Sequence, residues 1–308
     1  MSMSIQAKIV PVDSQRPSLS VLIRVRGALP SLRPAELRVA EAVLADPAGI
    51  SESSITAVAR QCQTSETTVL RFCRAIGLAG YPELRIALAR AAQGEETDHQ
   101  QGAPVSNVIT ASDTLAEVVA KITHADCRAI EDTGAALDLS MLEAAVELVA
   151  TANRVDIYGI GASALAGQDL HHKLHRIGLV SFMWPEGHLA LTSAAVLQEG
   201  DVAIAISHTG TTVDTVDALR VARRRGAATI AVTNFARSPL AATADVVLTT
   251  AARETTFRSG TMSSRIVQLA LVDYLYAGVA LRSYRSTLDS LERTTAEVAT
   301  RHGLPPGH

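Results

Sequence analysis

The sequence is poor in the residues that build disulfide frameworks, metal centres and membrane spans. Its 308 residues include three cysteines, Cys62, Cys73 and Cys127, an odd number with no CxxC or Cys/His metal spacing. We therefore expect reduced thiols that pack as small apolar side chains. No uninterrupted apolar run approaches the roughly 20 residues that cross a bilayer, and the first residues lack the apolar stretch of a secretory signal. These absences predict a cytoplasmic protein.

Aromatic residues and lysine are also scarce. Aromatics make up 3% of the chain, and lysine occurs only at Lys8, Lys121 and Lys173. Hydrophobic residues nevertheless reach 47%, so the core must be built mainly from Ala, Val, Leu and Ile. The length is sufficient for two ordinary domains.

Charge and composition divide the chain into unequal parts. Residues 1–93 carry 11 Lys+Arg against 7 Asp+Glu, whereas residues 94–308 carry 17 against 24. Residues 94–107 are polar, contain Gly and Pro, and show no sustained periodicity, which is typical of a linker. We predict a flexible leader over 1–18, a helical domain over 19–93, and a second domain with flanking helices over 108–308. A basic domain joined to an acidic one is common where a polyanion-binding module accompanies another function.

Residues 51–85 have the pattern of a helix-turn-helix. Apolar residues recur at helical spacing, and Ser65 is placed to cap a second helix that bears one apolar stripe. Thr67, Arg71 and Arg74 point away from that stripe, where they can enter the major groove of DNA. An ordinary amphipathic hairpin with a solvated polar face fits the spacing equally well.

The second domain alternates strands with helices. A helical pattern covers residues 114–150 with a break near 138–140, and five short runs rich in Val, Ile and Ala follow. Helical patterns separate most of these runs, at 164–177, 189–198 and 212–225. Alternation of this kind predicts an α/β domain with a parallel sheet covered by helices on both faces.

Two turns of that domain are suited to bind an anion. The first, IYGIGASALAG, places Gly161 and Ser163 where a strand gives way to a helix. Its GxGxxA pattern also fits a dinucleotide fingerprint, with Glu186 at a suitable distance, so NAD binding is an alternative. The second turn, ISHTGTTVDT, gathers hydroxyls and a glycine before a helix, which favours a single phosphate group. A histidine cluster at 171, 172 and 175 lacks a third metal ligand of suitable spacing, so we predict no metal and no cofactor.

The run TSETTVLRFCRAIGLAGYPEL closely resembles the recognition-helix region of the RpiR family of bacterial regulators, and the resemblance spans about residues 19–92. It implies an all-α helix-turn-helix domain that binds double-stranded operator DNA. The DNA contacts that it implies are Ser65, Thr67, Thr68, Arg71 and Arg74, with Tyr81 reaching the DNA backbone.

The two turns of the second domain resemble the signatures of the SIS (sugar isomerase) domain, which RpiR regulators carry after their helix-turn-helix. This resemblance covers about residues 113–281 and implies a phosphosugar ligand, such as an amino-sugar 6-phosphate. The implied ligand residues are Gly161, Ser163, Ser207, His208, Thr209, Gly210, Thr212, Glu254 and Ser259. Thr209 stands where the family usually has Ser, so its methyl group narrows the pocket, and His208 either donates to the phosphate or faces solvent.

SIS domains also occur in isomerases and etherases, which need a general base near the sugar. Glu254 is the acidic candidate in a matching loop, so a phosphosugar isomerase or etherase is the alternative function. The attached helix-turn-helix favours a regulator without enzymatic activity. We expect a homodimer or homotetramer that presents paired recognition helices to a two-fold symmetric operator and regulates carbohydrate metabolism genes.

Overall fold

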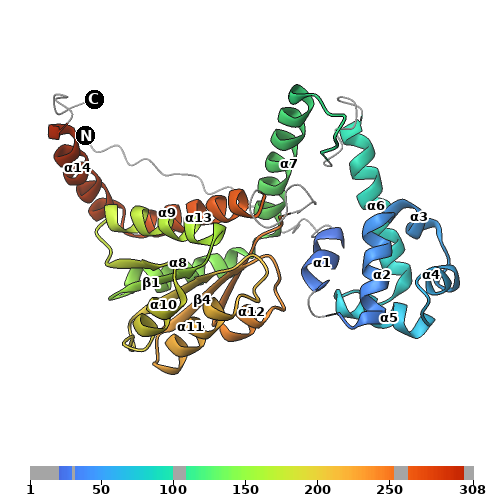
Figure 1. The fold of residues 1–308 in the computed structure, drawn as a ribbon, viewed down its shortest axis with the longest axis horizontal. Coiled ribbons are helices and arrows are strands. Elements are labelled where there is room, and N and C mark those ends of the chain that lie inside the picture. Colours follow the sequence, from blue (N-terminus) through green and yellow to red (C-terminus); the bar gives the residue numbers. More distant parts are fainter. Residues whose placement is uncertain (1–20, 30–31, 100–108, 253–262, 302–308) are drawn as a thin grey trace, which may run out of the picture.

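The computed structural model describes residues 21–29, 32–99, 109–252 and 263–301. Within the first two ranges the chain is entirely helical (Figure 1). Its helices are α1 (Val21–Ala28), α2 (Pro34–Ala45), α3 (Pro47–Glu52), α4 (Ile55–Gln61), α5 (Glu66–Ala75) and α6 (Tyr81–His99). The predicted leader lies outside the described residues.

Two features of the helical domain differ from the sequence prediction. The short α3 was not expected; Pro47 begins it, and the Asp46 side chain caps it by accepting a hydrogen bond from the N–H of Gly49. The helix α6 continues to His99, so the helix extends into the first residues of the segment 94–107 that the sequence predicts as a linker. Glycine within a helix costs only about 1 kcal/mol relative to alanine, so Gly94 does not end α6.

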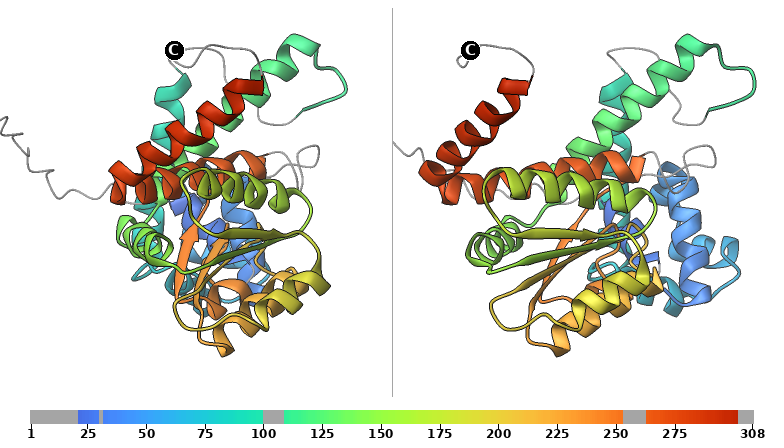
Figure 2. Two further views of the ribbon diagram at one scale, coloured as in Figure 1. Left: turned by 90° about the vertical axis from the view of Figure 1, so that its left-hand side faces the viewer. Right: turned by 60° about the vertical axis from the view of Figure 1, so that its left-hand side comes forward.

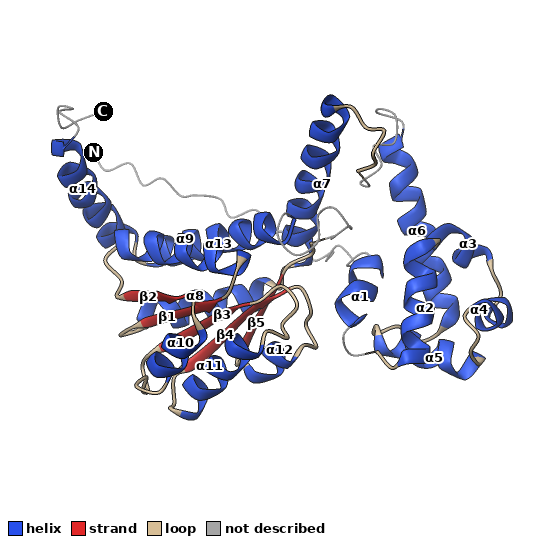
Figure 3. Cartoon of the chain, viewed as in Figure 1, coloured by secondary structure: helices blue, strands red, loops and turns tan. Residues whose placement is uncertain are grey.

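The second domain confirms the predicted α/β class. Its elements are α7 (Leu115–Ala136), α8 (Leu139–Thr151), β1 (Val155–Gly159), α9 (Ala162–Arg176), β2 (Ser181–Trp184), α10 (Gly187–Ala194), β3 (Val202–Ile206), α11 (Val213–Arg224), β4 (Ala228–Thr233), α12 (Pro239–Thr243), β5 (Val246–Thr249), α13 (Ser263–Arg282) and α14 (Tyr284–Arg301). The five strands form one parallel sheet in the order β2-β1-β3-β4-β5 (Figure 3).

Each face of the sheet is covered by its own set of helices (Figures 1 and 2). Because side chains alternate along a strand, Ile204 and Ile206 of β3 face α8, α9 and α13, whereas Ala203 and Ala205 face α10 and α11. In β3, isoleucines therefore fill one side of the sheet and alanines the other. The three central strands β1, β3 and β4 are almost wholly buried, as expected where helices cover both faces, whereas the edge strands β2 and β5 are partly exposed.

A buried polar network underlies β1. Asp156 is fully buried, and its carboxylate accepts hydrogen bonds from Arg154 Nε at 2.7 Å, from Trp184 Nε1 at 3.0 Å and from Ser193 Oγ. The Tyr158 hydroxyl contacts the same carboxylate at 3.4 Å. Burial, followed by the neighbouring Asp156 charge, raises the pKa of Tyr158. The network joins β1, β2 and α10, and it supplies hydrogen-bond donors to the buried carboxylate of Asp156.

Among the described residues, α13 alone is long and apolar enough to cross a membrane by length and composition. Its apolar stripe, which includes Leu271, Leu275 and Val279, packs into the core beside α8 and α9. A core helix satisfies the same criteria, so this property carries no argument for a membrane.

Candidate functional site

The sheet has one topological switch point, between β1 and β3. The strand β1 lies between β2 and β3, and the helices that follow β1 and β3, namely α9 and α11, pack on opposite faces. Loops that diverge in this way leave a crevice at the carboxyl ends of the strands, where open α/β sheets bind their ligands. We call the residues 160–163 and 207–212 that border it the β1/β3 crevice.

The loop after β3 is organised around a buried hydroxyl. Ser207 is buried, its Oγ accepts a hydrogen bond from Gly210 N at 3.1 Å, and it lies 3.0 Å from Thr212 Oγ1. Gly210 has a φ of +63°, and a Cβ there would lie 2.1 Å from Ser238 Oγ. The loop thus needs glycine at position 210, and the predicted grouping of Ser207, Gly210 and Thr212 is present.

The helices that start at the crevice have no side-chain cap. Gly161 precedes α9 and Thr212 precedes α11, and among the described residues no side chain accepts a hydrogen bond from the first turn of either helix. In contrast, Asp138, Glu186 and Ser238 cap α8, α10 and α12. Free N–H groups and the positive end of the helix dipole therefore meet at the crevice, which suits an anion.

Ser163 lies in the first turn of α9 and has a partner that the sequence analysis missed. It is 8% exposed, and its Oγ accepts a hydrogen bond of 3.1 Å from Nε2 of Gln268 on α13. Gln268 is 1% exposed and belongs to the buried stripe of α13. A glutamine among apolar residues at helical spacing is the signal that could have identified it.

The other predicted ligand residues are less closely grouped. Thr209 is exposed, and its Oγ1 accepts a hydrogen bond of 2.9 Å from Thr211 Oγ1. His208 is half-buried, with its ring edge-on to Phe235 at a centroid distance of 5.6 Å. Glu254 and Ser259 lie outside the described residues.

Glu186, the acidic residue of the NAD alternative, is engaged elsewhere. Its carboxylate caps α10 by accepting hydrogen bonds from the N–H groups of His188 at 2.9 Å and Leu189 at 3.0 Å. The first of these bonds is the main reason why its pKa lies below the usual value. The strand order also differs from the 3-2-1-4-5-6 order of the dinucleotide-binding fold. Neither observation favours NAD.

The helix-turn-helix consists of α4, a turn over residues 62–64, and α5. Ser65 caps α5 by accepting a hydrogen bond from Thr68 N at 3.3 Å, and Gly77, at a φ of +74°, follows its end. Of the predicted DNA contacts, Ser65, Thr67, Arg71 and Arg74 are exposed. Thr67, Arg71 and Arg74 follow one another at four- and three-residue spacing, so they share one face of α5.

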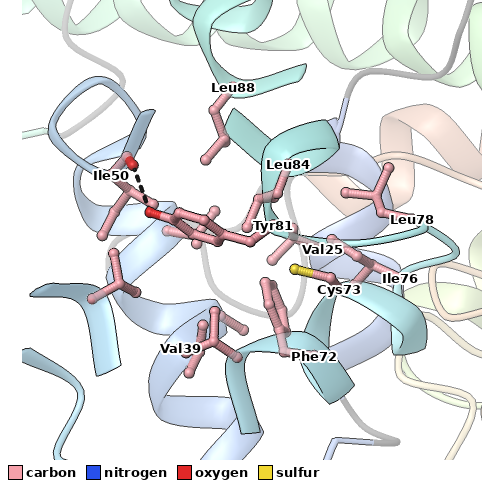
Figure 4. Close-up of a cluster of buried hydrophobic side chains, with 14 of the residues drawn as sticks. Val25, Val39, Ile50, Phe72, Cys73, Ile76, Leu78, Tyr81, Leu84 and Leu88 are labelled. Atoms are coloured by element: carbon pink, nitrogen blue, oxygen red, sulfur yellow. Dashed lines mark hydrogen bonds between the residues drawn. The ribbon is translucent and has the colours of Figure 1, made fainter. Parts of the chain in front are cut away.

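Two of the predicted DNA contacts do not belong to that face. Thr68 is 5% exposed, because it lies on the buried side of α5 with Val69 and Phe72. Tyr81 is also 5% exposed, and its hydroxyl donates to the carbonyl oxygen of Ser53 at 2.9 Å. It also donates to the carbonyl oxygen of Ile50 at 3.2 Å (Figure 4). The expectation that Tyr81 reaches the DNA backbone therefore conflicts with its position, which ties α6 to the end of α3.

The guanidinium of Arg71 contacts two side chains of the helix-turn-helix domain. Its Nε lies 3.4 Å from Glu36 Oε1 on α2, and its Nη2 lies 3.4 Å from Thr68 Oγ1. The carboxylate of Glu36 also accepts a hydrogen bond from Arg33 N at 3.1 Å at the start of α2. Glu36 and Thr68 thus orient the guanidinium from the scaffold side, while Arg71 remains exposed.

A helix-turn-helix joined to a parallel-sheet domain with an anion-suited crevice defines a ligand-responsive class of transcriptional regulator. Comparison with known families agrees: the helix-turn-helix domain of the rpiR family matches residues 19–95, and the SIS domain matches residues 148–278. An uncharacterised HTH-type transcriptional regulator of Caldanaerobacter subterraneus is 37% identical over 91% of this chain and 98% of its own length. The chain belongs to the RpiR family of helix-turn-helix transcriptional regulators with a SIS domain.

Two further relatives bear on the function. The NanR protein of Vibrio vulnificus, solved in complex with ManNAc-6P, is 30% identical over 91% of this chain and 98% of its own, with a TM-score of 0.57. The bifunctional protein glk of Burkholderia orbicola is 33% identical over 92% of this chain. Only 43% of the glk protein is covered, so the rest of that protein has no counterpart in the aligned region.

Proposed function

We propose that this regulator binds operator DNA through α5, with an affinity that is set by a phosphorylated sugar bound in the β1/β3 crevice. The observation that carries the proposal is the meeting of two uncapped helix N-termini with the hydroxyls of Ser163, Ser207 and Thr212. Free N–H groups, hydroxyl donors and two helix dipoles together satisfy a phosphate without requiring a cation.

The sugar that we propose is an amino-sugar 6-phosphate. Support comes from the likeness to NanR of Vibrio vulnificus, whose structure contains ManNAc-6P. Thr209 stands where the family usually has Ser, and its added methyl group narrows the site. The preferred sugar can therefore differ from ManNAc-6P, so its close analogues are tested beside it. The regulated genes would then be those that use that sugar.

For DNA we propose that Thr67, Arg71 and Arg74 enter the major groove, with Ser65 at the start of α5. Arginine reads guanine edges or binds phosphates, and hydroxyls contact either. A homodimer or homotetramer would present two such helices to a symmetric operator. The phosphosugar controls DNA binding only if it binds one DNA-affinity state better than the other.

A phosphosugar isomerase or etherase is the alternative. Such a reaction needs a base close to the sugar, and the candidate, Glu254, lies outside the described residues. The named regulator relatives cover nearly the whole chain, which favours regulation over catalysis. Incubation of the protein with ManNAc-6P and its isomers, followed by product analysis, decides this point: measurable turnover that Glu254→Gln abolishes would establish the enzyme.

The first experiment is thermal unfolding against a panel. The panel holds ManNAc-6P, N-acetylglucosamine 6-phosphate, glucosamine 6-phosphate and N-acetylmuramic acid 6-phosphate, with their unphosphorylated sugars and NAD as controls. A ligand at 100 times its Kd should stabilise the fold by about 2.7 kcal/mol. We expect one phosphosugar to stabilise the wild type and to lose its effect in Ser163→Ala and Ser207→Ala.

The second experiment measures operator binding with and without that phosphosugar. We expect its Kd for DNA to change by about 5–150-fold, the usual range of allosteric coupling. Equal operator affinity in both conditions would show that the crevice does not control DNA binding. Stabilisation by NAD alone would show that the ligand assignment is wrong.

A further inference from the structure

Gln268 is a polar side chain in an apolar place. It lies on the buried stripe of α13, one residue after Val267 and three before Leu271, and it is 1% exposed. Its amide reaches across to α9, where Nε2 donates to Ser163 Oγ at 3.1 Å. A residue 105 positions away in sequence thus contacts a hydroxyl of the proposed ligand site.

The direction of this hydrogen bond decides what Ser163 can do. A hydroxyl has one donor hydrogen and two acceptor lone pairs, and the amide NH₂ group can only donate. Gln268 therefore occupies a lone pair of Ser163 Oγ and leaves the Ser163 hydrogen available. A phosphate at neutral pH offers mainly acceptors, so a serine held in this state suits it.

The other end of the amide gives a second, independent observation. Gln268 Oε1 is buried and has no hydrogen-bond partner among the described residues. A buried amide oxygen without a partner is costly, and an apolar residue would fit the stripe without that cost. The interaction of Nε2 with Ser163 is the favourable contact that accounts for a glutamine at this position.

We propose that Gln268 is a positioning residue of the ligand site, which holds the Ser163 hydroxyl as a hydrogen-bond donor to the phosphosugar. The proposal rests on the function proposed above, because it assumes that Ser163 contacts that ligand. It assigns affinity for the phosphosugar to a helix outside the two loops that form the crevice.

The test is a double-mutant cycle on the full-length protein. Gln268→Met keeps the length of the side chain but removes the N–H donor, and Ser163→Ala removes its partner. The measured quantity is the Kd for each of the four phosphosugars of the panel, by calorimetry. Gln168→Met, at an exposed glutamine on α9, is the matched control.

We expect Gln268→Met to weaken binding about tenfold, and Ser163→Ala by a similar factor. If Gln268 acts through Ser163, the double variant binds as Ser163→Ala does, whereas independent residues would give a product of about a hundredfold. Ligand-free operator affinity should stay at the wild-type value, which separates positioning from general damage to the fold. Gln168→Met should bind the phosphosugar normally.

Gln268→Leu is the second variant if the methionine variant does not fold. Leucine is neutral and apolar, so it removes the donor to Ser163 without placing a charge in the buried stripe, and binding should fall about as in Gln268→Met. Wild-type affinity in either Gln268 variant, or independent losses in the cycle, would overturn the proposal while the proposed function stands. If the wild type binds no panel member at millimolar concentration, the proposed function fails and this proposal with it.

Discussion

The glycine of the β3–α11 loop allows a sharp test of how the crevice is built. Gly210 has a φ of +63°, and an added Cβ would lie 2.1 Å from Ser238 Oγ and 2.4 Å from Ser238 Cβ. Gly161, on the opposite side of the crevice, has a φ of +62° and open space around the same position. Alanine at either site meets an unfavourable backbone conformation, but only at position 210 does it also meet other atoms.

The magnitudes follow from these two effects. A positive φ costs a residue with a Cβ about 1–2 kcal/mol, and overpacking in a closely packed region adds about 1–3 kcal/mol. Gly161 combines its positive φ with a ψ of −127°, a combination that residues with a Cβ rarely adopt, so Gly161→Ala should lower the free energy of unfolding by about 1–3 kcal/mol through backbone strain alone. Gly210→Ala should lower it by about 2–5 kcal/mol and should also displace Ser207, whose Oγ accepts the Gly210 N–H.

The assay uses the single tryptophan of the chain. Trp184 lies on β2, so its fluorescence during urea denaturation reports the unfolding of the SIS domain and not that of the helix-turn-helix domain. Binding of the panel phosphosugars is measured in parallel. Equal destabilisation by the two alanine substitutions would refute the reasoning, because it would mean that contact with Ser238 does not restrict position 210.

Three further predictions concern the interior, the DNA surface and the pH dependence. Asp156→Ala should destabilise the domain by about 3–5 kcal/mol, since it leaves the buried network without its acceptor, whereas Asp273→Asn, at an exposed ion pair, should cost less than about 1 kcal/mol. Arg74→Ala should weaken DNA binding and reduce the salt dependence of log K by about one unit. Burial, and then the neighbouring histidines, lower the pKa of His171, so the folded state binds fewer protons than the unfolded state. Stability should therefore fall as pH drops below about 6.5, and His171→Gln should make that fall shallower.

Each of these predictions has an outcome that contradicts it. If Asp156→Ala and Asp273→Asn lowered the free energy of unfolding equally in urea denaturation, the buried network around Asp156 would stabilise the domain no more than an exposed ion pair does. An operator affinity unchanged by Arg74→Ala, in titrations at several salt concentrations, would remove that residue from the DNA surface. The same loss of stability between pH 7 and pH 5 in His171→Gln and wild type would assign that loss to other groups.

Most of the fold could be predicted from the sequence because its signals are local. The break between α7 and α8 falls within the predicted residues 138–140, and the Asp138 carboxylate caps α8 by accepting a hydrogen bond from Ser140 N at 2.9 Å. The central strands were visible as short runs rich in Val, Ile and Ala because both of their faces are buried. The six-residue α3 was missed, since so short a segment shows no periodicity of its own.

The interpretation of α5 shows where local reasoning ends. The spacing correctly placed Thr67, Arg71 and Arg74 on the outer face, because a single helix fixes that relation. It could not show that Thr68 turns inward, since α5 buries a wider stripe than the apolar residues alone suggest. The position of Tyr81 could not be predicted for the same reason: its hydroxyl partners are Ile50 on α3 and Ser53 just after it, 31 and 28 residues away.

The hydrogen-bond partner of Gln268 also depends on tertiary packing. Its position in a buried stripe was readable from the sequence, but its partner was not, because contact with Ser163 requires α9 and α13 to lie side by side on one face of the sheet. That packing is set by the apolar residues around both side chains. A change in how α13 lies on α9 would therefore alter the hydrogen bond to Ser163, and with it the affinity for the ligand, without touching either crevice loop. The double-mutant cycle tests whether the hydrogen bond between Gln268 and Ser163 determines the affinity for the phosphosugar.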